Sequence, residues 1–261
     1  MDSNPVVAII LAAGKGERMK SDLPKVLHKL GGKPMVEYVV ETAKNVGVEK
    51  IILVIGHKWE RTQSSLLYLS DGTFGKVEFV VQKEQLGTGH AVLQAKDQLS
   101  GFDGDILVLC GDVPLLTSNT VKRLLEEHWS KGVVATVLTS IVDDPSGYGR
   151  IIRNKDGMVE KIVENKDASG EEKKVKEINT GTFCFDCKSL FSVLGKITTD
   201  NKQGEYYLTD VLELSRKENL PIWAVVAPNP EETLGINSQE ELERMEKILS
   251  ASSSGQTTLL P

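Results

Sequence analysis

Small residues and separated cations follow an apolar run near the start of this 261-residue chain. They are Ala12, Ala13, Gly14 and Gly16, with the cations Lys15, Arg18 and Lys25. Small residues allow backbone N–H groups to approach a ligand closely, and glycine permits a positive φ. Positive side chains beside such a backbone cradle suit a chain of phosphate groups. The segment therefore predicts a polyphosphate site.

Two common phosphate-binding motifs do not fit this segment. A Walker A loop requires G-x-x-x-x-G-K-[ST], which the segment lacks. The dinucleotide fingerprint requires G-x-G-x-x-G, and Met19 stands where its third glycine would be. Two glycines after a strand are weak support by themselves, and Arg18 and the Pro24-Lys25 pair make the pattern more specific. Lys15 is interpreted as a solvated loop lysine and stays out of the catalytic set.

Further polar residues stand just after apolar runs. Asp112 follows the run at 106–109 and could hold a divalent cation against phosphate oxygens, although a turn residue is an equally ordinary interpretation. Gln82 follows the run at 77–81, and its amide offers a donor and an acceptor to the edge of a pyrimidine. Gly87 and Thr88 allow close backbone approach, or simply mark a helix entrance. Asn237 by itself is only a capping candidate for the last helix.

Strand and helix patterns alternate through the first half of the chain. Strands are predicted at 6–11, 51–55, 77–81, 106–109 and 133–138, and amphipathic helices at 34–46, 59–69, 88–98 and 118–129. This alternation favours right-handed βαβ units and a parallel sheet covered on both faces. Ligands of such sheets bind outside the carboxyl ends of the strands. The segments 12–25, 82–88 and 111–114 should therefore share one edge.

The second half is less regular. A hairpin is predicted from 148–153 and 158–163, and the charged stretch 171–176 is a solvated loop or helix. Further strands are expected at 182–185 and 222–226, helices at 207–217 and 239–249, and a flexible tail at 250–261.

Composition excludes several classes of protein. A net charge of −6 argues against a general nucleic-acid binder, and no apolar stretch reaches the length of a membrane span. The first residues lack the cationic start of a signal peptide, and only three cysteines occur, so a reducing cytoplasm is expected. Cys184 and Cys187 form a C-x-x-C without a second pair and are predicted to be packed thiols. The four histidines show no metal-ligand spacing.

Several motifs in one order carry a family resemblance. The chain reads Leu-Ala-Ala-Gly-Lys-Gly-x-Arg-Met over 11–19 and Ser-Asp-Leu-Pro-Lys-Val-Leu-His over 21–28. Matching segments follow at 110–114, 147–150, 163–166, 177–181, 204–210 and 235–237. This sequence resembles the sugar-nucleotide pyrophosphorylases, above all those that use UTP and N-acetylglucosamine 1-phosphate. The resemblance runs from about residue 6 to 249.

The resemblance implies a fold and an organisation. The fold is α/β, a Rossmann-like mixed but mostly parallel sheet with helices on both faces, as in nucleotide-diphospho-sugar transferases. One domain at 5–249 would comprise a nucleotide-binding half, about 5–115, and a sugar-binding half, about 116–249. No hexapeptide repeat follows, so no left-handed β-helix and no acetyltransferase activity are expected.

The resemblance also assigns residues. Arg18 and Lys25 would be catalytic, and Asp112 and Asn237 would bind Mg²⁺. The nucleotide would meet Leu11, Ala12, Ala13, Gly14, Gln82, Gly87, Thr88 and Gly111. The sugar would meet Gly149, Glu164, Asn179 and Thr209. Cys110 departs from the aromatic residue that often precedes the Gly-Asp pair, which alters packing around the ribose.

The implied reaction transfers UMP from UTP to N-acetylglucosamine 1-phosphate, giving UDP-N-acetylglucosamine and pyrophosphate. The same chemistry on glucose 1-phosphate, or with TTP, is the main alternative. A non-catalytic sugar-nucleotide sensor is a distant one, because a sensor would be expected to lose the cations or the metal ligands. Nucleic acid and membrane partners are not expected, and the oligomeric state stays open.

Overall fold

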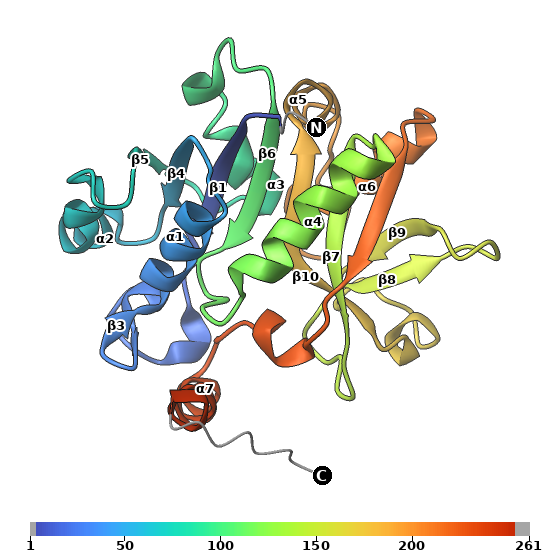
Figure 1. Ribbon diagram of the computed structural model, residues 1–261. Helices are drawn as coiled ribbons and strands as arrows, with labels where there is room; N and C mark the ends of the chain where they lie inside the picture. Colours follow the sequence, from blue (N-terminus) through green and yellow to red (C-terminus); the bar gives the residue numbers. More distant parts are fainter. Residues whose placement is uncertain (1–3, 254–261) are drawn as a thin grey trace.

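One mixed sheet forms the centre of the molecule (Figure 1). The structure is a computed structural model that describes residues 4–253. The strands along the sheet, in spatial order, are β11 (Ile222–Val226), β7 (Ala135–Ile141), β10 (Glu177–Asp186), β6 (Asp105–Cys110), β1 (Val6–Ala12), β4 (Lys50–Ile55) and β5 (Val77–Val81). The hairpin β8 (Arg150–Arg153) and β9 (Val159–Val163) joins the sheet where β8 pairs with β10.

Strand directions confirm the predicted mixed, mostly parallel sheet. The pairs β6–β1, β1–β4, β4–β5 and β7–β11 are parallel. β10 is antiparallel to both of its neighbours, β6 and β7. Since β10 runs opposite to the rest of this row, its first residues arrive at the edge where the other strands end.

Helices cover both faces of the sheet, which explains the apolar runs. Alternate residues of β1 enter opposite cores: Val7 and Ile9 on one face, Ala8 and Ile10 on the other. A strand buried on both faces must be apolar throughout. The helices α1 (Met35–Asn45), α2 (Trp59–Leu66) and α4 (Ser118–Lys131) cover one face. The helices α3 (Thr88–Leu93), α5 (Cys187–Leu194) and α6 (Asp210–Lys217) cover the other.

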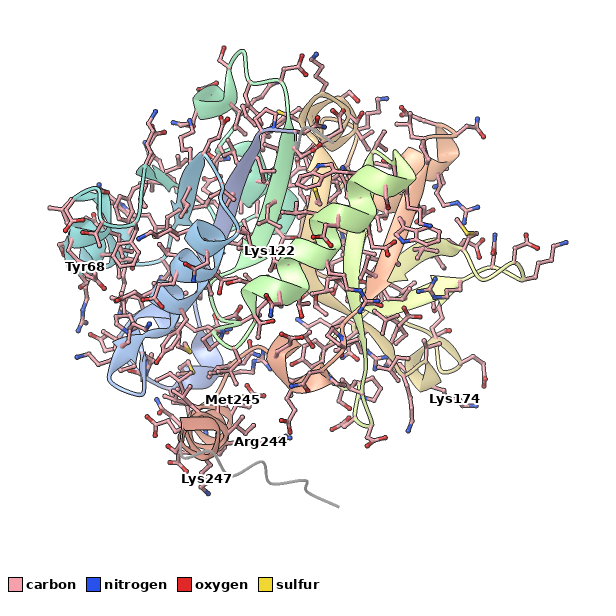
Figure 2. All side chains as sticks on the ribbon, viewed as in Figure 1. Tyr68, Lys122, Lys174, Arg244, Met245 and Lys247 are labelled. Carbon is pink, nitrogen blue, oxygen red and sulfur yellow. The ribbon has the colours of Figure 1, made fainter. Side chains whose placement is uncertain are left out.

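A third, smaller core attaches the last helix, α7 (Gln239–Ser253), beside the short hairpin β2 (Lys29–Leu30) and β3 (Lys33–Pro34). Leu242 and Met245 of α7 pack there with Met19 and Leu30. Figure 2 shows Met245 on the side of α7 nearer the body of the domain and Lys247 on the far side. Met19, which lies in the predicted phosphate-binding segment, and the last helix therefore share one core.

Several element boundaries differ from the sequence predictions. α7 continues to Ser253, so the predicted tail begins four residues too early; Ser250 donates to Glu246 O at 2.8 Å within the helix, and no Gly or Pro stops it there. Residues 254–261 lie outside the described part of the chain. α3 ends at Leu93, five residues before the predicted end, and a 3-10 turn follows at Asp97–Leu99. α2 likewise ends in a 3-10 turn, Leu67–Ser70.

Strand β10 is longer than predicted. Its first part is polar, so the sequence pattern did not show it as a strand. Only 182–185 showed a strand pattern, yet pairing begins at Glu177. The register shifts between Asn179 and Phe183, and Gly181 within this irregularity has φ +78°. The predicted hairpin is confirmed, and the charged stretch 171–176 holds a short 3-10 turn, Glu172–Lys174. Within residues 4–253, no helix is long and apolar enough to cross a membrane.

We expect Met245→Ala to lower the free energy of unfolding by about 2–5 kcal/mol, because it leaves a cavity in the third core. Met245 is 2% exposed. Lys247→Ala, on the exposed side of the same helix, should change it by less than about 0.5 kcal/mol. Urea unfolding of both variants measures the difference, and equal stabilities would contradict this packing.

Candidate active site

The predicted segments meet at one edge of the sheet. The strands β1, β4, β5 and β6 are parallel, so the residues that follow them lie on the same side. Gly111 N–H donates to Leu11 O at 2.9 Å, which joins two of the segments directly. A Cβ added at Gly111 would lie 3.1 Å from that oxygen, so a larger residue would push the segments apart.

The loop after β1 folds back on Lys25. Gly16 has φ +66°, and a Cβ there would lie 2.7 Å from Lys25 Cβ. Gly14 has open space where a side chain would be, since nothing lies within 4 Å of an added Cβ. Arg18 is exposed and forms no ion pair with any residue in the described range 4–253. The loop thus leaves an open backbone and a free guanidinium at the edge of the sheet, as a polyphosphate site requires.

Lys25 joins the two predicted metal ligands. Its ammonium donates to Asp112 Oδ2 and, at 2.6 Å, to Asn237 Oδ1. The side chains of Lys25 and Asp112 are only 14% and 23% exposed. A carboxylate and a carboxamide oxygen therefore converge on one cation, and such hard oxygen ligands suit Mg²⁺. The donor set fits a divalent cation, with the ammonium as its stand-in.

Asn237 is held by the start of α7. Its backbone N–H donates to Glu241 Oε2 at 2.5 Å, and Ser238 N–H donates to the same oxygen at 3.2 Å. Glu241 N–H in turn donates to Ser238 Oγ at 3.2 Å, which completes a capping box. Ser238 and Glu241 thus cap the helix. The Asn237 amide nitrogen donates to Gly235 O at 3.2 Å, and its Oδ1 is left for Lys25. The Ser-x-x-Glu spacing could have identified this cap from the sequence.

Tyr148 belongs to the same region and was given no role in the sequence analysis. Gly235 N–H donates to its hydroxyl at 3.3 Å. Burial raises the pKa of Tyr148, while the Gly235 amide and Arg18 oppose that rise. The hydroxyl therefore stays protonated at neutral pH and keeps a proton to donate beside Gly235. The matching segment 147–150 was the available signal.

The four predicted sugar-binding residues lie together. Asn179 N–H donates to Gly149 O at 2.9 Å, and Thr209 Oγ1 donates to Glu164 Oε1 at 3.3 Å. A Cβ added at Gly149 would lie 3.4 Å from Glu164 Oε1. Asn179 Oδ1 already accepts from Gly181 N–H at 3.0 Å, so its amide nitrogen is the group left to meet a ligand. The cluster offers both a carboxyl acceptor and an amide donor.

Glu164 carries an electrostatic cost in the folded chain. Burial raises its pKa, the Thr209 hydroxyl opposes this, and the charges of Asp210, Asp167 and Glu205 add to the rise. The pKa of nearby Asp210 rises to about 6, first through burial and then through Glu213 and Asp167. Acidic groups thus surround Glu164, one of the predicted sugar-binding residues.

Residues 86–89 bind a segment from the second half of the chain. Tyr206 N–H donates to Leu86 O, and Gly89 N–H donates to Tyr206 O, both at 2.8 Å. The predicted nucleotide residue Thr88 accepts from Leu208 N–H at 3.0 Å through its hydroxyl oxygen. Gly87 has φ +110°, and a Cβ there would lie 2.6 Å from Tyr206 O. Glycine at this position therefore lets the two halves of the site meet.

The cysteines are packed thiols. Cys184 and Cys187 are buried and free, which confirms their prediction. Cys110 is also free, donates to Gly181 O at 3.4 Å, and has its pKa raised to about 12 by burial. In the described part of the chain, no three His, Cys, Asp or Glu side chains gather into a metal-binding group.

Fold and site define a nucleotidyl transferase. The family model described as nucleotidyl transferase matches residues 7–228, and the chain belongs to this family. Bifunctional protein GlmU of Geobacillus thermodenitrificans (strain NG80-2) is 50% identical over 242 residues, which are 93% of this chain and 51% of that protein. The Bifunctional protein GlmU of Bacillus cereus (strain AH187) matches to the same extent. The chain therefore spans about half the length of the curated relatives it matches.

Solved structures support the fold. A UDP-glucose pyrophosphorylase complexed with UDP-glucose superposes with a TM-score of 0.75 at 19% identity, covering 95% of this chain and 99% of that one. A putative glucose-1-phosphate thymidylyltransferase from Bacillus anthracis gives 0.75 at 22% identity, covering 98% and 97%. The predicted fold class and family resemblance are confirmed.

We expect Glu164→Gln to stabilise the protein at high pH. Because the pKa of Glu164 is raised in the folded protein, the protein loses stability as the pH rises above the ordinary pKa of a glutamate. Glutamine does not titrate, so the variant avoids this loss. The variant and the parent should unfold at similar temperatures near pH 4, and the variant at a higher temperature near pH 8. Glu160→Gln, at an exposed position of β9, is the control and should show no such difference. A pH-independent effect of Glu164→Gln would contradict this cause.

Gly87→Ala should destabilise the protein more than Gly72→Ala. Both glycines have a positive φ, but nothing lies within 4 Å of a Cβ added at Gly72. Gly72→Ala should therefore cost only the conformational penalty, about 1 kcal/mol. Gly87→Ala also displaces the 206–208 segment. Urea unfolding compares the two losses, and equal values would show that the close contact with Tyr206 is unimportant.

Proposed function

We propose that this protein transfers UMP from UTP to N-acetylglucosamine 1-phosphate, giving UDP-N-acetylglucosamine and pyrophosphate. The observation that carries the proposal is the convergence of Asp112 and Asn237 oxygens on the Lys25 ammonium, beside an open phosphate loop. The 50% identity to Bifunctional protein GlmU supports the choice of substrates.

The reaction requires positioning and charge neutralisation. A phosphate oxygen of the sugar 1-phosphate attacks the α-phosphorus of UTP and forms a new P–O bond. The bond from the α-phosphorus to the oxygen that bridges to the β-phosphorus breaks, and pyrophosphate leaves with that electron pair. The nucleophile is already an anion, so no general base is needed. The protein must hold two anions that repel each other.

The cations of the loop supply that charge. Arg18 is exposed without an ion-pair partner in residues 4–253 and would bind the departing β- and γ-phosphates. Lys25 would move from the metal ligands to the phosphates near the reacting phosphorus. Asp112 and Asn237 would hold Mg²⁺, which when bound neutralises phosphate charge and aligns the reacting groups. Leu11–Gly14 and Gly111 would pack against the nucleotide.

Two groups of residues would select the substrates. Gln82, Gly87 and Thr88 would read the base, with Thr88 acting through the backbone since its hydroxyl already bonds Leu208. Gly149, Glu164, Asn179 and Thr209 would contact the sugar. A carboxylate suits sugar hydroxyls, and the Asn179 amide nitrogen suits the carbonyl of an N-acetyl group.

Three free thiols among the described residues favour a reducing, cytoplasmic location.

Pyrophosphate release with Mg²⁺ tests the proposal. UTP, TTP, CTP, ATP and GTP are each paired with N-acetylglucosamine 1-phosphate and with glucose 1-phosphate. We expect UTP with the N-acetylated sugar to give the highest kcat/KM. Preference for another pair would overturn the substrates while keeping the chemistry. No release with any pair, from folded protein, would favour the sensor hypothesis.

We expect Lys25→Ala and Asp112→Ala each to lower kcat by more than tenfold, because each removes a charge from the reacting phosphates or their metal. Lys15→Ala removes a loop lysine that no hydrogen bond or ion pair holds among the described residues, so it is the matched control and should stay within threefold. Circular dichroism must show that all three variants are folded. A near-normal kcat in either active-site variant would remove that residue from the mechanism.

A further inference from the structure

We propose that His90 is a positioning residue that fixes the orientation of the Gln82 amide and thereby selects uracil over cytosine. This inference rests on the proposed function, in which Gln82 reads the base. It arises from three polar side chains in contact along α3: Gln82 precedes the helix, His90 lies within it, and Gln94 is its C-cap residue. These three side chains have no role in the proposed phosphate chemistry.

The Gln82 amide nitrogen has both of its hydrogens committed. Gln82 is 3% exposed. Its Nε2 lies 3.1 Å from Gly87 O and 3.0 Å from His90 Nδ1. Among residues 4–253, no donor reaches Gln82 Oε1, and this oxygen is not among the buried unpartnered atoms. Oε1 is therefore the atom of the amide that a ligand can meet.

His90 cannot satisfy both of its neighbours as they stand. Gln94 Nε2 lies 3.1 Å from His90 Nε2 and 3.0 Å from His90 O. A neutral imidazole has one acceptor nitrogen and one donor nitrogen. If both amide nitrogens faced the ring as donors, one N–H would point at another N–H. One of the two glutamines must therefore turn its amide.

Burial decides which glutamine turns. Gln94 is only half-buried, so water can replace the hydrogen bond that it loses. Turning either amide in place sets its oxygen against a carbonyl oxygen, that of Gly87 for Gln82 and that of His90 for Gln94. Gln82 is almost fully buried and cannot swing away to water, whereas Gln94 can. An unpaired polar group costs more where water cannot reach it. His90 Nδ1 is therefore the acceptor, the ring proton is on Nε2, and the half-buried Gln94 amide moves its nitrogen away from that proton.

This arrangement leaves an acceptor facing the base. Uracil carries a hydrogen on N3 that can donate to Gln82 Oε1. Cytosine has a bare acceptor at N3, so two acceptors would face each other and CTP would be rejected. Without the His90 acceptor, only Gly87 O would hold the amide, and Gln82 could turn to present Nε2 to cytosine.

The first test measures kcat/KM for UTP and for CTP with N-acetylglucosamine 1-phosphate. His90→Leu removes the acceptor and should lower the UTP-to-CTP ratio by at least tenfold. His90→Asn places a carboxamide oxygen near the Nδ1 position and should restore the ratio to within threefold of the parent. Gln94→Leu should leave it at the parent value or higher. General damage to the fold would lower kcat/KM for both nucleotides together and leave the UTP-to-CTP ratio unchanged.

Either of two results would overturn the inference: a folded His90→Leu that keeps the parent ratio, or a His90→Asn that falls as far as His90→Leu. A parent enzyme that uses CTP as well as UTP would instead contradict the proposed uracil preference and this inference with it. If His90→Leu does not fold, long-range ¹H–¹⁵N NMR on the parent decides, with His90→Asn assigning the signal. The Nε2–H tautomer is expected, and an Nδ1–H ring would overturn the inference.

Discussion

The Lys25 ammonium lies between the Asp112 carboxylate and the Asn237 carboxamide oxygen, and the rest of the site is arranged around this contact. Asp112 follows Lys25 by 87 positions in the sequence, and Asn237 follows Lys25 by 212. Separation of this kind requires the parallel strands to bring Lys25 and Asp112 to one edge. It also requires α7 to return Asn237 there. The third core, in which Met19 and Met245 pack together, fixes α7 against the loop that we propose binds phosphate.

The two proposed ends of the site obey different physical constraints. At the proposed phosphate end, Lys25 is paired with Asp112 and Arg18 is exposed, so both cations are accessible to anionic ligands. At the proposed sugar end, Glu164 is buried near other acids and its pKa is raised, which costs stability when it ionises. The contacts of residues 86–89 with 206–208 connect the ends through backbone hydrogen bonds. Preorganised groups of this kind avoid rearrangement when substrates bind.

Much of the fold could be predicted because strands buried on both faces must be apolar, and the edge rule then placed three loops together. The first part of β10 was missed since Glu177 and Asn179 carry no strand pattern. Asp112 and Asn237 could be paired only through the family resemblance, because their spacing in the sequence does not show that the residues before α7 lie beside Asp112. The Ser238-x-x-Glu241 spacing could have identified the cap of α7, whereas the role proposed for His90 depends on the orientation of its ring and of two amides, which residue types alone do not reveal.

Binding of Mn²⁺ as a paramagnetic substitute for Mg²⁺, followed by EPR, tests the central claim that the Asp112 and Asn237 oxygens form a cation site which Lys25 fills. A non-hydrolysable UTP analogue is present in one series and absent in the other. The account predicts that Asp112→Asn weakens Mn²⁺ binding at least tenfold with the analogue. It also predicts that Lys25→Met binds Mn²⁺ more tightly than the parent without it, because the competing ammonium is gone. Unchanged affinities in both variants would contradict the account.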